Sequence, residues 1–166
     1  MVVIGKGLGG GVLPLAAVIA REDLDVASDR ALGHYTHEKN PVLCAAALAT
    51  IDYIESHGLV AHARALGRYT LDRLKEMKDR HPLIGDVRGL GLFLGIELVK
   101  DRQTRERAND EAEAVMYAAL SRGLGFKTTM GNILTLTPPL IITREQMDRA
   151  LAIIEECIAE VENAEG

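Results

Sequence analysis

The stretch Val2-Val3-Ile4-Gly5-Lys6-Gly7-Leu8-Gly9-Gly10-Gly11 places one lysine at the end of an apolar, strand-like run and follows it with glycines. In α/β folds, reactive groups lie at strand ends and in the loops after them. Glycines in such a loop let the backbone approach a ligand closely. The stretch therefore predicts an α/β fold in which Lys6 is placed for chemistry. A surface lysine in a flexible glycine-rich turn is the alternative that the spacing alone leaves open.

Two familiar phosphate-binding motifs do not fit these residues. In a P-loop the lysine follows the glycines and a Ser or Thr comes next, whereas Lys6 precedes the glycines. Gly5, Gly7 and Gly10 satisfy G-x-G-x-x-G, but a dinucleotide site requires a helix that opens at the glycines. The chain continues instead into an apolar run at residues 12–20, where Pro14 blocks a helix interior. This run predicts a second buried strand.

The lysine segment and four later segments resemble, in order and spacing, the C-terminal portion of the class III, or omega-type, aminotransferases. These are fold-type I enzymes that use pyridoxal 5′-phosphate (PLP). The four later segments are PLAA at 14–17, HYTHEKNP at 34–41, GDVRGLG at 85–91 and LTLTPPL at 134–140. The resemblance implies an α/β fold that contains the end of a PLP-binding large domain, long helices and a small C-terminal α/β domain with α+β packing.

The resemblance also implies how the chain is divided. Residues 1–58 would form the C-terminal end of the large domain with the lysine loop, residues 59–82 a connecting helix, and residues 83–166 the small domain. Family members carry the lysine well past the middle of the chain. We therefore expect a truncated piece whose cofactor-binding aspartate, stacking aromatic and phosphate loop lie upstream, and which is inactive by itself.

Cofactor binding is expected at two residues. Lys6 resembles the Schiff-base lysine of the family, which holds PLP and then moves the Cα proton of the substrate. Its amine must be neutral to attack the cofactor aldehyde. Thr36 resembles the family threonine that reaches across a dimer interface to the cofactor phosphate of the other subunit, which implies a homodimer with a shared active site. No metal site is expected, because His57 and His62 lack carboxylate or cysteine support.

Arg88 and Thr135 are the candidates for the substrate pocket. Arg88 either meets an anion or pairs with Asp86, and we favour a structural turn with a buried ion pair. Thr135 stands three residues before a Pro-Pro pair, where many family members place an arginine that clamps a carboxylate. A threonine cannot supply that charge. The substrate is therefore expected to be an ω-amine, an amino alcohol or an amine with a phosphonate, phosphate or sulfonate group, which Lys127 could approach.

Local signals define the helices and strands. Asn40 and Pro41 open a helix over 42–56 that ends at Gly58, and a second helix over 59–80 ends before Pro82. We expect strands at 91–99, 125–128 and 133–136, a helix at 110–121, and a terminal helix after a T-x-x-Q capping box that begins at Thr143.

The composition agrees with part of a cytoplasmic enzyme. The chain has 166 residues, 48% of them hydrophobic, and a formal net charge of −5. Such a charge argues against a nucleic-acid partner, and no apolar run reaches the roughly 18 to 20 residues that span a bilayer. Cys44 and Cys157 lie far apart within apolar helical patterns, and we expect both to be buried thiols.

Taken together, these features predict a PLP-dependent aminotransferase that moves an amino group from a small amine or amino acid to a keto acid. A related ammonia-lyase or phospho-lyase that acts on an amine with a phosphonate or phosphate group is the alternative within PLP chemistry. An inactive dimerisation module is the alternative outside enzymes, and the intact Lys6 and Thr36 argue against it.

Overall fold

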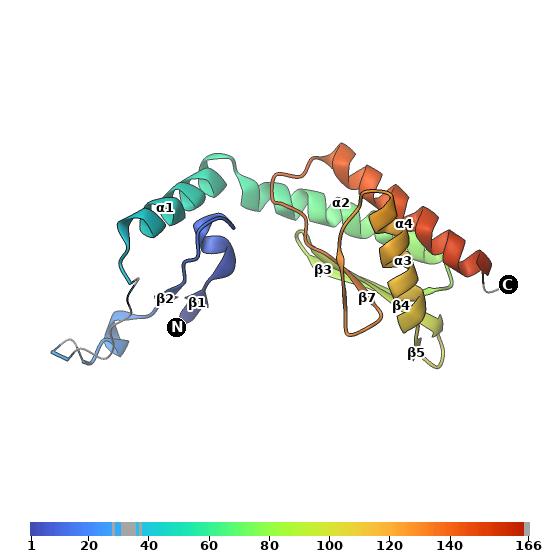
Figure 1. Cartoon of the computed structure of the whole chain (residues 1–166), viewed down its shortest axis with the longest axis horizontal. Coiled ribbons are helices and arrows are strands. Elements are labelled where there is room, and N and C mark those ends of the chain that lie inside the picture. Colours follow the sequence, from blue (N-terminus) through green and yellow to red (C-terminus); the bar gives the residue numbers. More distant parts are fainter. Residues whose placement is uncertain (28, 31–35, 37, 165–166) are drawn as a thin grey trace. The chain divides into compact units, whose positions relative to one another are not determined.

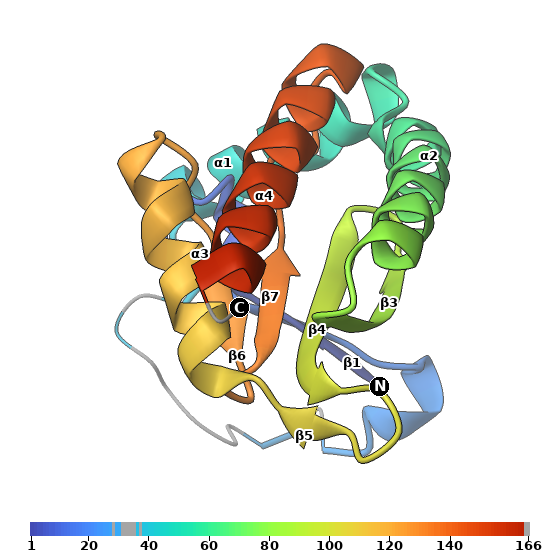
Figure 2. The same ribbon diagram turned by 90° about the vertical axis from the view of Figure 1, so that its right-hand side faces the viewer.

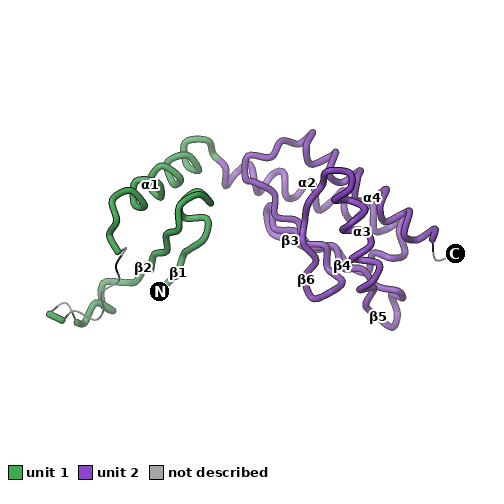
Figure 3. The backbone as a smooth tube through the Cα atoms, viewed as in Figure 1, with its two compact units in different colours: residues 1–58 green, residues 59–166 purple. Residues whose placement is uncertain are grey.

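The computed structural model describes residues 1–27, 29–30, 36 and 38–164. The chain folds into two compact units, Met1–Gly58 and Leu59–Gly166 (Figure 3). Among the helices of the described part, none is long and apolar enough to cross a membrane.

The first unit combines a two-stranded antiparallel ribbon with one long helix (Figure 1). Its elements are β1 (Val2–Ile4), the 3₁₀ helix η1 (Lys6–Gly9), β2 (Ala17–Ile19), the 3₁₀ helix η2 (Glu22–Leu24) and α1 (Pro41–Ser56). The predicted order of strand, loop and strand is confirmed. The expected burial of the second strand is wrong, because Val18 and Ile19 are 61% and 58% exposed. A ribbon of two short strands has no third strand or covering layer to bury it.

The start of α1 is determined by local side-chain chemistry. The side-chain oxygen of Asn40 accepts a hydrogen bond from the backbone N–H of Val42 at 3.0 Å. Pro41 occupies the first helical turn, where its missing N–H costs no hydrogen bond. Gly58 follows the helix with φ of +61°, a conformation that glycine adopts without strain. The predicted caps are confirmed, and the helix begins one residue earlier than expected.

The second unit is a sheet covered by helices on one face (Figure 2). Its elements are α2 (Leu59–Arg80), β3 (Ile84–Leu90), β4 (Phe93–Asp101), β5 (Glu106–Arg107), α3 (Asn109–Ser121), β6 (Lys127–Thr129), β7 (Ile133–Leu136) and α4 (Arg144–Ala164). The strands are antiparallel in the order β3-β4-β7-β6, with β5 paired to the end of β4. Figure 2 shows α2, α4 and α3 side by side over this sheet. The expected α+β packing is confirmed.

Alternation along the strands decides which sheet face is buried. Leu94, Ile96 and Leu98 on β4 are almost fully buried and face the helices. They join a core with these other large buried side chains: Leu74, Met77, Ile84, Val115, Leu134, Met147, Ile154 and Ile158. On β4 and β3, Phe93 and Leu90 remain 65% and 87% exposed. The alternation of apolar residues therefore sets which face of the sheet the helices cover. The other face carries polar groups such as Arg88 and Glu97.

Residues 84–90 form a strand, and our expectation of a structural turn around Arg88 is wrong. Residues 84–90 pair with β4 through contacts such as Val87 with Ile96 and Leu90 with Phe93. A Cβ on Gly85 would lie 2.7 Å from Val99 Cγ2, so this glycine serves close packing inside the sheet. Only Gly91, with φ of +57°, makes the reversal into β4. Glycine content signalled a turn, but strand pairing decided the conformation.

A reciprocal pair of hydrogen bonds opens α4. The Thr143 backbone N–H donates to Gln146 Oε1 at 2.9 Å, and the Gln146 N–H donates to Thr143 Oγ1 at 3.2 Å. The predicted capping box is confirmed.

The contact between α2 and the β3–β4 turn predicts a large effect of one methyl group. A Cβ on Gly67 would lie 2.1 Å from the carbonyl oxygen of Gly91, which is backbone and cannot rotate away. We expect Gly67→Ala to destabilise the chain by about 3 kcal/mol, at the upper end of overpacking costs. Urea unfolding followed by circular dichroism measures this change. Gly125→Ala, where a Cβ meets nothing within 4 Å, is the matched control and should change stability by less than about 0.5 kcal/mol.

The two cysteines differ, and our expectation that both are buried is wrong for Cys44. Cys44 is exposed on α1, whereas Cys157 is fully buried in the core beside Arg122. Burial raises the pKa of the Cys157 thiol above its ordinary value, with the charge of Arg122 opposing that rise. A raised pKa leaves less of the reactive thiolate at any given pH.

Iodoacetamide at pH 8 should therefore alkylate Cys44 of the folded chain and leave Cys157 intact. Peptide mass mapping identifies the modified residue, and the unfolded chain should carry an adduct on both cysteines. An adduct on Cys157 under folding conditions would show that the core around α4 opens.

Candidate active site

Lys6 is separated from the end of β1 by Gly5 alone and is the first residue of η1. Its φ is +53°, in the left-handed region that costs a residue with a side chain about 1 to 2 kcal/mol. Glycine would avoid this cost and is present on both sides of the lysine. A strained non-glycine residue in a glycine loop is the kind of outlier from which a functional role can be inferred.

The amine of Lys6 is available. The side chain is exposed, and among the described residues it has neither a hydrogen bond nor an ion pair. A free primary amine at a strand end fits the carbonyl group of PLP, to which only an amine of this kind can attach covalently. The described residues leave this amine in water.

Thr36 lies in a turn, four residues before the cap of α1, and is exposed. An exposed hydroxyl is suited to donate a hydrogen bond to a phosphate of another subunit. The histidines at positions 34 and 37, which flank Thr36 in the sequence, lie outside the described residues. Lys6 and Thr36 belong to the first unit, and Arg88 and Thr135 belong to the second.

Arg88 lies on β3, and its guanidinium is already engaged. Nη1 donates to Asp86 Oδ2 at 2.7 Å and to Glu97 Oε2 at 2.6 Å. The predicted pairing with Asp86 is confirmed, but the pair is half-exposed and lies on a strand, so its expected burial in a turn is wrong. The hydrogen bond that Arg88 donates to Asp86, followed by the one that it donates to Glu97, raises the pKa of Arg88. Two carboxylates hold this arginine, and it offers no free charge to a substrate anion.

Glu97 was missed in the sequence because it lies nine residues from Arg88. The two approach each other only through the antiparallel register of β3 and β4, in which Asp86 is opposite Glu97. The alternation of apolar and other side chains in the segment 93–101 places Glu97 on the outer face of the sheet. This pattern was the signal in the sequence that could have identified Glu97 as a neighbour of Arg88.

Thr135 lies on β7 and forms a hydroxyl pair with Thr129 of β6. Their Oγ1 atoms are 2.7 Å apart, and Lys127 is directly opposite Thr135 in the strand register. Thr135 borders two hollows. One of about 330 Å³ also contains Arg88 and Thr129, and the other, of about 540 Å³, is mostly apolar and contains Lys127. The position therefore presents neutral hydroxyls with one neighbouring lysine, and the one guanidinium of the smaller hollow, that of Arg88, is already held by two carboxylates.

A family model described as aminotransferase class-III matches residues 1–158. The chain is 49% identical over 158 residues to an (R)-1-hydroxy-2-aminoethylphosphonate ammonia-lyase of Vibrio splendidus, covering 95% of this chain and 33% of that protein. It is 46% identical over 162 residues to an isoleucine 2-epimerase of Lentilactobacillus buchneri, covering 98% of this chain and 36% of that protein.

A solved structure described as a transaminase with L-alanine superimposes with a TM-score of 0.92 at 32% identity. The match covers 99% of this chain and 41% of that one. The chain thus spans about a third of the length of the curated relatives that it matches.

Proposed function

The chain belongs to the class III aminotransferase family, and from this premise we propose that the complete protein transfers an amino group from an amine or amino acid to a keto acid. PLP is the cofactor of this family. The observation that carries the proposal is Lys6, a strained, exposed and unpaired amine at the end of a strand in the described part of the chain.

Lys6 performs two tasks in this proposal. Its Nζ would hold the cofactor covalently, and the same amine would take the proton from the substrate Cα. Bound PLP supplies an electron sink for the resulting negative charge. A side chain with four methylene groups can move its amine between these positions without a change in the backbone.

The proposal includes a homodimer in which Thr36 donates its hydroxyl to the cofactor phosphate held by the other subunit. Large apolar side chains on α1 support a covering partner, because Val42, Leu48, Ile51 and Tyr53 are all exposed. The proposed location is the cytoplasm, a reducing compartment in which the free thiols of the chain would stay reduced.

Reductive trapping tests the assignment of Lys6. Borohydride treatment of the complete, PLP-loaded protein should leave a pyridoxyl group on Lys6, which peptide mapping detects. Lys6→Arg keeps the charge but cannot form the bond, so the label and the activity should fall at least about a thousandfold.

Lys39→Arg is the matched control, since Lys39 is a second exposed lysine with positive φ, +58°. It should retain the label and the activity. A folded protein that binds PLP without any label on Lys6 would contradict the proposal and favour the non-catalytic dimerisation module.

A second function is favoured by Thr135. This residue removes the expected carboxylate clamp, and the relative that is 49% identical acts as an ammonia-lyase on an aminophosphonate. We propose, as the second candidate, a PLP-dependent ammonia-lyase that acts on an amine with a phosphonate group. The Thr129–Thr135 hydroxyl pair and Lys127 are the groups that would face this anion.

The products separate the two functions. Amino transfer requires a keto acid and yields a new amino acid without net ammonia, whereas elimination releases ammonia with no keto acid present. The complete protein should be incubated with 1-hydroxy-2-aminoethylphosphonate and with a panel of amines, each with and without pyruvate. Release of ammonia that does not depend on pyruvate would select the lyase, and alanine formation would select the aminotransferase.

A further inference from the structure

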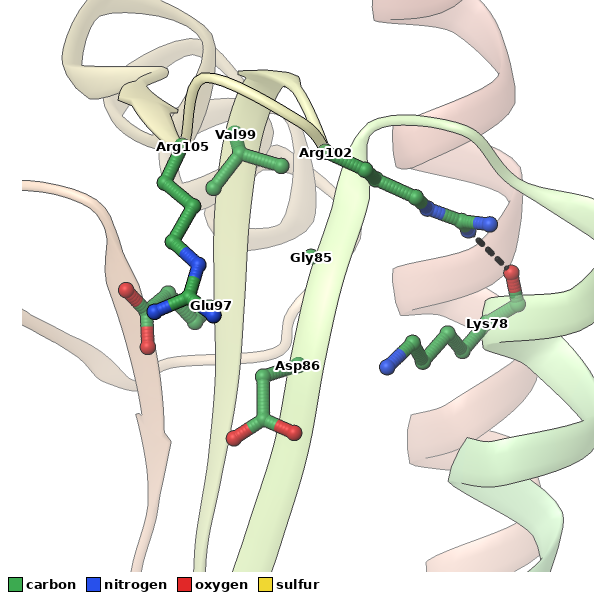
Figure 4. A pocket seen from close by; sticks show the side chains of 7 residues that line it. All are labelled: Lys78, Gly85, Asp86, Glu97, Val99, Arg102 and Arg105. Atoms are coloured by element: carbon green, nitrogen blue, oxygen red, sulfur yellow. Dashed lines mark hydrogen bonds between the residues drawn. The ribbon is translucent and has the colours of Figure 1, made fainter.

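A charged hollow of about 450 Å³ lies on the second unit, where the C-terminal part of α2 meets β3, β4 and the turn after β4. It is lined by Lys78, Gly85, Asp86, Glu97, Val99, Arg102 and Arg105. Figure 4 shows Lys78 and Arg105 extending into it from opposite sides, with Gly85 between them. None of the residues proposed to act on the cofactor or the substrate amine lines it.

The two carboxylates in this hollow share one arginine outside its lining. Asp86 and Glu97 both accept hydrogen bonds from Arg88 Nη1, at 2.7 and 2.6 Å. Arg102, which also lines the hollow, is bound to backbone carbonyls. Its Nε donates to the carbonyl of Ile84 at 3.0 Å, and its Nη2 donates to two carbonyls at the end of α2, which leaves Nη1 unused.

Lys78 and Arg105 have no such partner. Among the residues that the structure describes, neither side chain makes a hydrogen bond or an ion pair. The lining holds three cations, Lys78, Arg102 and Arg105, against the two carboxylates, which leaves an excess of one positive charge. Arg88 lies outside the lining, donates to both carboxylates and adds a second positive charge beside them. This local excess lies in a chain with a formal net charge of −5. Unpaired charges of one sign in a concave site attract ligands of the other sign.

The backbone presents Arg105 at a cost. Its φ is +59°, in the left-handed region where glycine is preferred. The turn is held from within, because Asp101 Oδ1 accepts hydrogen bonds from the N–H groups of Gln103 and Thr104, at 2.8 and 2.7 Å. These backbone hydrogen bonds lower the pKa of Asp101, so the turn remains braced at neutral pH. An arginine in a turn that would suit glycine indicates that its guanidinium has a use.

We propose that this hollow binds a doubly charged oxyanion, either inorganic phosphate or the phosphate group of a small metabolite. The Arg105 guanidinium offers two parallel N–H donors, the Lys78 ammonium supplies a point charge from the other side, and Arg102 contributes its unused Nη1. The Asp86 and Glu97 oxygens on the rim accept hydrogen bonds from the hydroxyl groups of a phosphate ester. This site goes beyond the proposed function and does not depend on it.

Calorimetric titration of the complete, PLP-loaded protein with inorganic phosphate and, separately, with glycerol 3-phosphate tests the proposal. Bound PLP fills the cofactor phosphate site, so any remaining phosphate binding is independent of it. Arg105→Gly removes the guanidinium and relieves the turn, and it should raise the Kd at least about tenfold, the loss of a charge-assisted hydrogen bond. Lys78→Met should weaken binding by a similar factor. Tighter binding of the ester would identify a metabolite as the ligand, and equal binding would identify phosphate itself.

Arg68→Met is the matched control, because it removes an exposed cation of α2 outside the hollow. It should leave the Kd unchanged, and all three variants should keep the circular dichroism of the parent. The proposal is overturned if neither probe binds at millimolar concentration, if Arg105→Gly and Lys78→Met both bind as the parent does, or if Arg68→Met weakens binding equally.

Discussion

The backbone contact between Gly67 on α2 and Gly91 at the β3–β4 turn is the constraint on which the second unit depends. With no side chain on either residue, the helix approaches the turn closely enough that a Cβ on Gly67 would lie 2.1 Å from a carbonyl oxygen. This approach places Leu74 and Met77 of α2 into the core over Ile84. A larger residue at this contact would lift the helix from the sheet and open the core beneath it.

The position of α2 also determines what lies at its end. Because the helix stops above β3, the Arg102 guanidinium can donate hydrogen bonds to the backbone carbonyls of Lys78 and His81 at its C-terminal end. The turn after β4, which carries Arg102, also presents Arg105 toward Lys78. Arg88 is paired with two carboxylates. Three arginines on one side of a small unit therefore have three different roles. The hydrogen-bond and ion-pair partners of each side chain, and not its residue type, separate structural charges from those that are available to a ligand.

The chemistry of the family divides between the two units of this chain. The first unit supplies Lys6, for which we propose the removal of the substrate Cα proton, a step that amino transfer and elimination have in common. The second unit carries the Thr129–Thr135 pair in place of a guanidinium, and that difference concerns the substrate. In our proposals Lys6 binds the cofactor and Thr135 lies near the substrate. The aminotransferase and lyase proposals therefore share the role of Lys6 and differ in the substrate that Thr135 would face.

The sequence by itself determined the family and the elements whose signals are local, and it singled out Lys6 as the candidate for cofactor binding. The caps at Asn40 and at Thr143 with Gln146, and the bounds of α2, follow from chemistry within a few residues. Only the tertiary structure decided that residues 84–90 form a strand, that Glu97 shares Arg88, that Cys44 is exposed and that Arg105 faces an open hollow. The physical reason is the same in each case. Strand register, burial and charge pairing depend on residues that are distant along the chain, and glycines in a strand and glycines in a turn look alike until their neighbours are known.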